Sequence, residues 1–261
     1  MLPLRRRDGR PLLIGHRGAA SLAPENTLAA FRAAVDAGVD LIEFDALELR
    51  DGDLVVAHSH DLHEVSHGAA RGTLKAMTLE EIRRVCPQLP TLDEALDFFA
   101  EKPEVGAHLD LKSPRAAAAT AGALRRFGLL ERTLVSSFHS RALRRLAALE
   151  PGLRLGFTFP RNVLRVDDRR SSGSVVGGGL RALRSVTPGL VDLLLARSRA
   201  TALVLHHGVV SEAVVRRAHA RGAPVVAWTV DDPVELARVD RAGVDAVVTN
   251  DPSVFVSTLE T

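Results

Sequence analysis

The sequence predicts an α/β fold, a (β/α)₈ TIM barrel that forms a single domain over residues 1–261. Short apolar, β-branched runs alternate with longer segments rich in Ala, Leu and Arg, and such alternation requires a parallel sheet covered by helices. Eight of the runs are strand-like, which is the number of strands in this barrel. An open dinucleotide-binding sheet is disfavoured because no Gly-x-Gly-x-x-Gly turn follows the first strand.

Each predicted strand is a short apolar run that leads into a helical pattern. The strands are expected at Leu12–Gly15, Asp40–Asp45, Val105–Lys112, Arg132–Ser137, Leu153–Phe157, Ala202–His206, Pro224–Thr229 and Asp245–Thr249. The helices are expected at Asn26–Ala37, Thr91–Ala100, Pro114–Phe127, Ser140–Leu149, Leu180–Ser198, Ser211–Arg221 and Val234–Ala242. Thr91 with Glu94, and Thr78 with Glu81, have the spacing of capping boxes that begin helices.

One element breaks the alternation, because Asp51-Gly52 separates two strand-like runs after the second strand. Asp-Gly between alternating strands predicts a β-hairpin with a two-residue turn. That turn places Asp45 opposite His58, and Glu43 projects on the same face as Asp45. The sequence therefore predicts a hairpin extension that brings two carboxylates close to an imidazole.

Two stretches interrupt the barrel pattern. Residues 59–90 form a short excursion that contains His60, His63 and His67. These histidines are expected in a solvated loop, with the substrate mouth or an alternative to His58 as the other interpretations. Residues 161–179 are charged and then rich in Ser and Gly, which predicts a mobile loop on the barrel.

Composition excludes several classes of function. The 34 basic and 32 acidic residues give a mixed surface, and 4% aromatic content offers bases little to stack on, so no nucleic-acid partner is expected. No apolar run reaches the roughly 18 residues of a membrane span. The N-terminal stretch lacks the apolar core of a secretory signal, and Cys86 is the only cysteine. We therefore expect a cytoplasmic protein, and the sequence leaves its oligomeric state open.

Charged residues gather at the predicted carboxyl ends of the strands, where barrels of this kind build their active sites. Glu43 and Asp45 close the second strand, and Asp110 closes the next barrel strand. Carboxylates at one rim repel unless a cation lies between them. Three oxygen donors without a thiolate suit one divalent cation, Mg²⁺ or Ca²⁺.

The neighbouring side chains suit a phosphodiester. Arg17 can hold two phosphate oxygens and Lys112 supplies a point charge beside them. His16 and His58 then provide the general base and the general acid that phosphodiester cleavage needs. The sequence therefore predicts a metal-dependent phosphodiesterase with His16 and His58 as catalytic residues.

An ordered set of motifs covers nearly the whole chain. It comprises His16-Arg17-Gly18, Pro24-Glu25-Asn26-Thr27, Ile42-Glu43-Phe44-Asp45, Val55-Val56-Ala57-His58, Pro90-Thr91-Leu92-Asp93-Glu94, Leu109-Asp110-Leu111-Lys112, Trp228-Thr229-Val230 and Thr249-Asn250-Asp251-Pro252. With these motifs the chain resembles the glycerophosphodiester phosphodiesterase family, whose members are TIM barrels that release glycerol 3-phosphate and an alcohol from a small-molecule diester.

The resemblance implies the same roles for the residues named above, with His16 and His58 as the acid/base pair and Glu43, Asp45 and Asp110 as cation ligands. Arg17 and Lys112 would contact phosphate, and Trp228 would face the substrate. Attack by the neighbouring glycerol hydroxyl, through a cyclic phosphate, would fit such a site.

The chain departs from the family pattern at two positions. The family usually has Glu where this chain has Asp110, and Asp where this chain has Ser59. These departures put cation affinity and the orientation of His58 in doubt. Glu25 and Asn26 are expected to support the first loop, His206 and His207 to lie near the rim, and His108 and His139 to be structural or peripheral. Two alternatives remain: a lysophospholipase D- or sphingomyelinase D-like activity on lipids, and a barrel that binds phosphodiesters without turnover.

Overall fold

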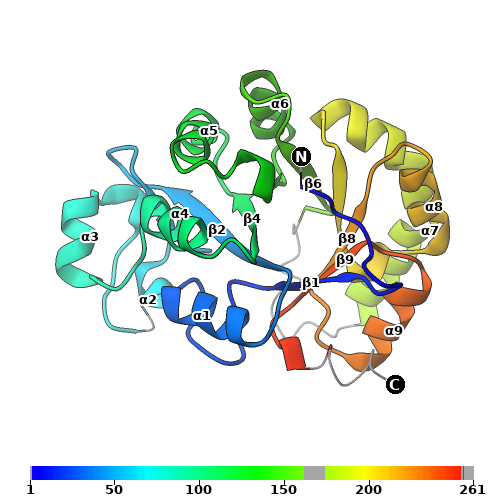
Figure 1. Ribbon diagram of the computed structural model, residues 1–261, viewed down its shortest axis with the longest axis horizontal. Coiled ribbons are helices and arrows are strands. Elements are labelled where there is room, and N and C mark those ends of the chain that lie inside the picture. Colours follow the sequence, from blue (N-terminus) through cyan, green and yellow to red (C-terminus); the bar gives the residue numbers. More distant parts are fainter. Residues whose placement is uncertain (1, 67, 162–173, 254, 256–261) are drawn as a thin grey trace.

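The computed structural model describes residues 2–66, 68–161, 174–253 and 255. Within these residues nine strands form one sheet in the order β1-β9-β8-β7-β6-β5-β4-β2-β3. β1 also pairs with β2, and all neighbours except β2 and β3 are parallel, so eight strands close into a barrel with helices outside it (Figure 1). The predicted (β/α)₈ barrel is confirmed.

The strands follow the predicted runs closely. They are β1 (Leu12–Gly15), β2 (Leu41–Glu48), β3 (Leu54–Val56), β4 (Gly106–Leu111), β5 (Thr133–Ser137), β6 (Arg154–Phe159), β7 (Ala202–His206), β8 (Val225–Trp228) and β9 (Ala246–Thr249). The α-helices are α1 (Leu28–Asp36), α2 (Leu62–Val65), α3 (Leu79–Val85), α4 (Leu92–Glu101), α5 (Ala117–Arg126), α6 (Ser140–Leu149), α7 (Ser174–Ser198), α8 (Glu212–His219) and α9 (Pro233–Arg241). No helix within the described part of the chain is long and apolar enough to cross a membrane.

Alternate residues of most barrel strands serve two separate cores. Outward side chains such as Leu13 and Phe44 pack under the helices in the larger core. Inward side chains such as Ile14 and Leu41 form a second, smaller core inside the barrel, joined by Leu4 from the N-terminal segment. This inner core lies beneath the carboxyl ends of the strands, where the charged residues of the candidate site gather.

The β2–β3 hairpin is present, but the predicted register is wrong by one residue. Ala46 pairs with Val56, and Glu48 pairs with Leu54. The turn contains three residues, Arg50 to Gly52, because Gly52 adopts a φ of +93° that lengthens the turn by one position. Asp45 therefore lies opposite Ala57, and His58 follows one residue later.

The predicted excursion after the hairpin is compact. It contains α2, a 3₁₀ turn at Leu74–Ala76 and α3, and Leu62, Leu74 and Ile82 pack with the hairpin in a third small core. The capping box predicted at Thr78 is confirmed at the start of α3.

The loop predicted for residues 161–179 is wrong over its last six residues, because α7 begins at Ser174. Each glycine costs a helix only about 1 kcal/mol, and an established helix extends readily, so the Gly-rich segment joins the apolar helix that follows. The rest of that prediction, residues 162–173, lies outside the described residues, and so does His67.

Candidate active site

A cavity of about 300 Å³ opens at the carboxyl ends of the barrel strands. It is lined by all eight residues that the sequence nominated: His16, Arg17, Glu43, Asp45, His58, Asp110, Lys112 and Trp228. These residues come from β2, β4 and β8 and from the segments that follow β1, β3 and β4. The structure therefore brings the whole predicted set together at one mouth of the barrel.

The turn after β1 holds Arg17 in a strained backbone conformation, with a φ of +51°. Its backbone N–H donates to Glu43 Oε2 at 2.9 Å, which ties the turn to β2. Gly18 follows with a φ of +92°, and a Cβ there would lie 2.6 Å from the Ala30 backbone carbon. Only glycine permits this close approach of the turn to α1.

Glu25 and Asn26 support this corner of the site, as expected. Glu25 Oε1 accepts a hydrogen bond from Arg17 Nη1 at 2.7 Å. The buried Asn26 side chain donates to Asp45 Oδ2 at 2.9 Å and accepts from the Asp45 backbone N–H at 3.2 Å. Asp45 is therefore held at both its side chain and its backbone.

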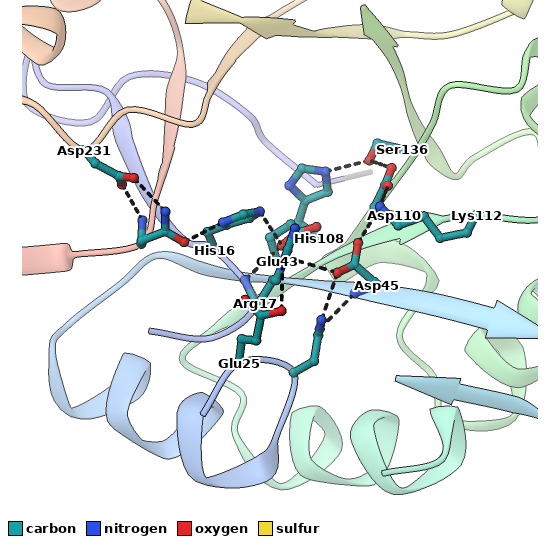
Figure 2. A network of polar contacts seen from close by, with 12 residues as sticks. His16, Arg17, Glu25, Glu43, Asp45, His108, Asp110, Lys112, Ser136 and Asp231 are labelled. Atoms are coloured by element: carbon teal, nitrogen blue, oxygen red, sulfur yellow. Dashed lines mark hydrogen bonds and ion pairs between the residues drawn. The ribbon is translucent and has the colours of Figure 1, made fainter. Parts of the chain in front are cut away.

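Lys112 lies between two of the carboxylates (Figure 2). Its ammonium nitrogen is 2.6 Å from Asp45 Oδ1 and 2.6 Å from Asp110 Oδ2. Burial opposes its charge, but Asp110 and Asp45 outweigh that effect and raise the pKa of Lys112. Burial would likewise raise the pKa of Asp45, but Lys112 and Arg17 hold that pKa well below its usual range.

Glu43 carries a charge that this cluster does not balance. Burial, together with the neighbouring Asp45 and Asp110 carboxylates, raises the pKa of Glu43 well above its usual value. Arg17 and Lys112, which pair with Asp45 and Asp110, form no ion pair with Glu43 among the described residues, so a further positive charge or a proton would stabilise the cluster. This excess charge and the all-oxygen donor set fit a hard divalent cation.

The carboxylates do not form a ready-made ligand set. Within the described residues, no three or more His, Cys, Asp and Glu side chains are arranged to hold a metal ion. Lys112 Nζ contacts two of the three carboxylates directly. Cation binding would therefore require Lys112 to move away from at least one of them.

The tautomer of His16 is set by a chain of hydrogen bonds at the left of Figure 2. Asn250 donates its Nδ2 to Asp231 Oδ2 at 2.6 Å, so its Oδ1 faces His16 Nδ1 at 2.7 Å as an acceptor. Nδ1 must then carry the proton, which leaves Nε2 as a proton acceptor. Burial and Arg17 lower the pKa of His16 to about 3, so the ring is neutral near pH 7.

His58 lines the same cavity with a side chain that is 31% exposed, and burial lowers its pKa. Its Nδ1 is buried without a hydrogen-bond partner among the described residues, and the Glu64 carboxylate is 3.8 Å away. Ser59, which stands where the family pattern has Asp, accepts a hydrogen bond from the Asp61 backbone instead. The ring of His58 is thus less firmly held than that of His16.

Trp228 ends β8 and lines the cavity as expected. Its Nε1 donates to the Val204 carbonyl at 3.2 Å, and its ring meets the edges of Phe138 and His206. His206 is not among the residues that line the cavity, and it contacts the site through the ring of Trp228. Its neighbour His207 pairs with Glu235 at 2.9 Å.

Sequence reasoning underestimated two histidines and missed the role of Asn250. His108 and His139, expected to be structural or peripheral, both line the cavity. The signal for His108 was its position two residues before Asp110, which places both on the inward face of β4. Asn250 directly follows β9, so its place at the rim was also available from the strand prediction.

Comparisons with known proteins agree on one family. The sequence model of the glycerophosphoryl diester phosphodiesterase family matches residues 16–254. A glycerophosphodiester phosphodiesterase from Caldanaerobacter subterraneus subsp. tengcongensis is 27% identical, over 95% of this chain and 97% of its own.

Solved structures show the same fold. A glycerophosphodiester phosphodiesterase from Thermotoga maritima superposes with a TM-score of 0.71 at 23% identity, covering 95% of this chain and 97% of that one. A phosphodiesterase from Oleispira antarctica, in complex with the product sn-glycerol-3-phosphate, has a TM-score of 0.76 at 23% identity, covering 97% of this chain and 98% of that one.

Proposed function

The chain belongs to the glycerophosphoryl diester phosphodiesterase family and is an enzyme that hydrolyses glycerophosphodiesters; we propose that it does so with two histidines and one divalent cation, releasing glycerol 3-phosphate and an alcohol. The observation that carries this proposal is the shared cavity, in which an oriented imidazole and a second imidazole flank two cationic side chains. The two cationic side chains suit an anionic diester, and the two imidazoles suit the proton transfers that its cleavage requires.

Arg17 and Lys112 hold the phosphate in this proposal. Both side chains are mostly buried, at 12% and 20% exposure, where charges act on a ligand more strongly than in water. Arg17 Nε lies 3.4 Å from Asp45 Oδ2 and makes no geometrically aligned hydrogen bond to the described residues, so its N–H can turn to a phosphate oxygen while the ion pair with Asp45 holds the guanidinium in place.

His16 is the general base. Its unprotonated Nε2 takes the proton of the attacking hydroxyl, which is the neighbouring glycerol hydroxyl of the substrate, and a cyclic phosphate forms as the bond to the leaving alcohol breaks. His58, nearer the mouth, protonates the leaving alkoxide. The phosphate anion raises the pKa of an imidazole beside it, which supplies His58 with the proton it must give up. Water then opens the cyclic phosphate with the two roles reversed.

Glu43, Asp45 and Asp110 would hold the divalent cation, Mg²⁺ or Ca²⁺. The uncompensated charge of Glu43 and the oxygen donors support this assignment. A cation bound there would neutralise phosphate charge and stabilise the charge that develops during cleavage. The shorter Asp110 in place of Glu leaves the choice of ion to experiment.

A chelator and add-back assay tests this function. Release of glycerol 3-phosphate is measured from a panel of soluble glycerophosphodiesters and lysolipids, after chelation and again with Mg²⁺ or Ca²⁺ restored. We expect release from the soluble diesters with at least one ion. Exclusive release from lysolipids would support the lipid-directed alternative, and no release with any ion would support a binding protein.

The variant His16→Ala tests the two-histidine mechanism. Loss of the general base lowers kcat by roughly 100- to 10,000-fold. The matched control is His63→Ala, because His63 is exposed and lies outside the cavity. Equal activity of the two variants would rule out the proposed base.

A further inference from the structure

The inner end of the cavity contains polar atoms that the proposed mechanism does not use. His108 on β4 and Thr158 on β6 both line the cavity, with Ser136 of the intervening strand β5 between them. Val204 and Val248, which belong to the apolar core inside the barrel, also line this cavity. A ligand that reaches this end therefore meets a few polar groups above an apolar floor.

The hydrogen bonds of His108 determine which of its nitrogens is free. The Ser136 hydroxyl has one proton, and it donates that proton to Asp110 Oδ1 at 2.8 Å. His108 Nε2, 2.9 Å from the same oxygen, must therefore be the donor in its own hydrogen bond to Ser136. In the neutral ring this leaves Nδ1 as an acceptor, and Figure 2 shows that nitrogen turned away from Ser136.

His108 Nδ1 is buried and has no hydrogen-bond partner among the described residues, although the residue is only 2% exposed. Buried polar atoms are seldom left without a partner, because each costs about 1–3 kcal/mol. Thr158 is 5% exposed, and its Oγ1 is likewise buried and unpartnered within the described part of the chain. β4 and β6 thus each present one polar atom without a hydrogen-bond partner, His108 Nδ1 and Thr158 Oγ1, to the same cavity.

The positions of these two atoms suit a short polyol. β4 and β6 are separated by one strand, and Thr158 lies four residues beyond Arg154, the β6 residue that is level with His108 through Leu134. The two polar atoms therefore reach the cavity at different heights, which suits a ligand that carries hydroxyls on successive carbons. Neither atom carries charge at the point of contact, so a hydroxyl is a better match than a phosphate or an ammonium group.

We propose that His108 and Thr158 form the glycerol subsite, in which His108 Nδ1 accepts a hydrogen bond from the terminal hydroxyl of the glycerol moiety and Thr158 Oγ1 bonds the same end of the molecule. This proposal rests on the proposed function and adds to it the residues that select glycerol over other diols. It also orients the substrate, with glycerol at the inner end of the cavity and the leaving alcohol at the mouth, beside His58.

Two substrates and one variant that removes a single hydroxyl test the subsite. The substrates are a glycerophosphodiester and the matching diester of propane-1,2-diol, which keeps the reacting hydroxyl but lacks the terminal one. Thr158→Val removes a hydroxyl that no described residue uses, so folding should be unaffected. We expect kcat/KM on the glycerol diester to fall about 10-fold and kcat/KM on the propanediol diester to stay unchanged. Thr120→Val is the matched control, because Thr120 Oγ1 is also buried and unpartnered but lies on α5, outside the cavity.

Two replacements of His108 separate a substrate contact from a structural role. In His108→Gln the amide reaches the position of Nε2 and can still bond Ser136, whereas in His108→Asn it takes the position of Nδ1. The subsite predicts that His108→Gln loses about 10-fold preference for the glycerol diester and that His108→Asn retains more of it. The reverse order, or equal losses on both substrates, would overturn the proposal and assign His108 to the support of Asp110.

Binding measurements distinguish failure of the subsite from failure of the proposed function. Calorimetry compares glycerol 3-phosphate with propane-1,2-diol 1-phosphate on wild-type protein and on Thr158→Val. A preference of about 10-fold for glycerol 3-phosphate, lost in the variant, supports the subsite even if no diester is turned over. Equal binding of the two phosphates by the wild type overturns it even if the diesters are hydrolysed.

Discussion

The Lys112 ammonium group lies 2.6 Å from the Asp45 carboxylate, and its second contact, also at 2.6 Å, is Asp110. This lysine is therefore part of the structure of the site as well as a candidate phosphate ligand. Because it supplies the positive charge that contacts two buried carboxylates at once, its removal should affect folding as much as activity.

Lys112→Met is expected to lower the free energy of unfolding by about 3–5 kcal/mol in the presence of a chelator, since Asp45 and Asp110 lose their buried partner. Urea unfolding at pH 8 measures the change. A divalent cation should restore part of it if the carboxylates then bind the ion. The control is Lys75→Met at an exposed position, and a loss at Lys112 no larger than at Lys75 would contradict the prediction.

Glu43→Gln is expected to make the chelated protein more stable at pH 8. The pKa of Glu43 is raised in the folded state, so its stabilising contribution is present below about pH 4.5 and is lost as the pH rises through the folded value. Above that value the ionised carboxylate destabilises the fold, and Gln avoids this. The melting temperature should therefore rise in the variant, while its increase on addition of Mg²⁺ or Ca²⁺ disappears. Exposed Glu80→Gln should show neither effect.

Asn250→Ala is expected to lower kcat about 10- to 100-fold with little change in KM, because His16 loses the acceptor that fixes its tautomer. Asp231→Asn should have a smaller effect in the same direction, since it acts on His16 only through Asn250. Steady-state kinetics and the pH profile of kcat/KM measure both. Unchanged kcat in Asn250→Ala would show that Asn250 does not orient the base.

The buried histidines make stability depend on pH. The pKa of His108 is lowered to about 4 by burial, so between pH 6.5 and 4 the unfolded chain takes up a proton that the folded protein does not. As the pH is lowered through this range, His108 therefore reduces the free energy of unfolding by about 1.4 kcal/mol per pH unit. Glu43 has a raised pKa and acts in the opposite sense, so the comparison is best made in Glu43→Gln protein. Adding His108→Asn should reduce the slope of unfolding free energy against pH by that amount.

Much of the barrel could be predicted because its strands are buried on both faces and read as short apolar runs between helical segments. The register of the β2–β3 hairpin could not. Asp-Gly permits turns of two or three residues, and the observed φ of Gly52 selects the longer one. Asp45 and His58 nevertheless line one cavity, because both lie near the carboxyl end of β2 in either register.

The residues predicted for the site line one cavity, but the sequence did not specify the contacts among them. Strand alternation places Glu43, Asp45 and Asp110 on inward faces, and this much follows from sequence spacing. The contact of Lys112 with two carboxylates depends on side-chain geometry that spacing does not specify. The hydrogen bonds that set the tautomers of His16 and His108 join strands far apart in the chain, so only the folded structure shows them.

The apolar core beneath the cavity has a kinetic consequence. Leu4, Ile14 and their neighbours form an apolar core inside the barrel below the site, so among the described residues the route for ligands lies at the carboxyl ends of the strands. Of two products formed in such a chamber, the one bound farther inside departs second and occupies the space that the next substrate needs. Accumulated product of this kind would slow turnover by competition, so the rate would follow the ratio of substrate to product rather than substrate concentration alone.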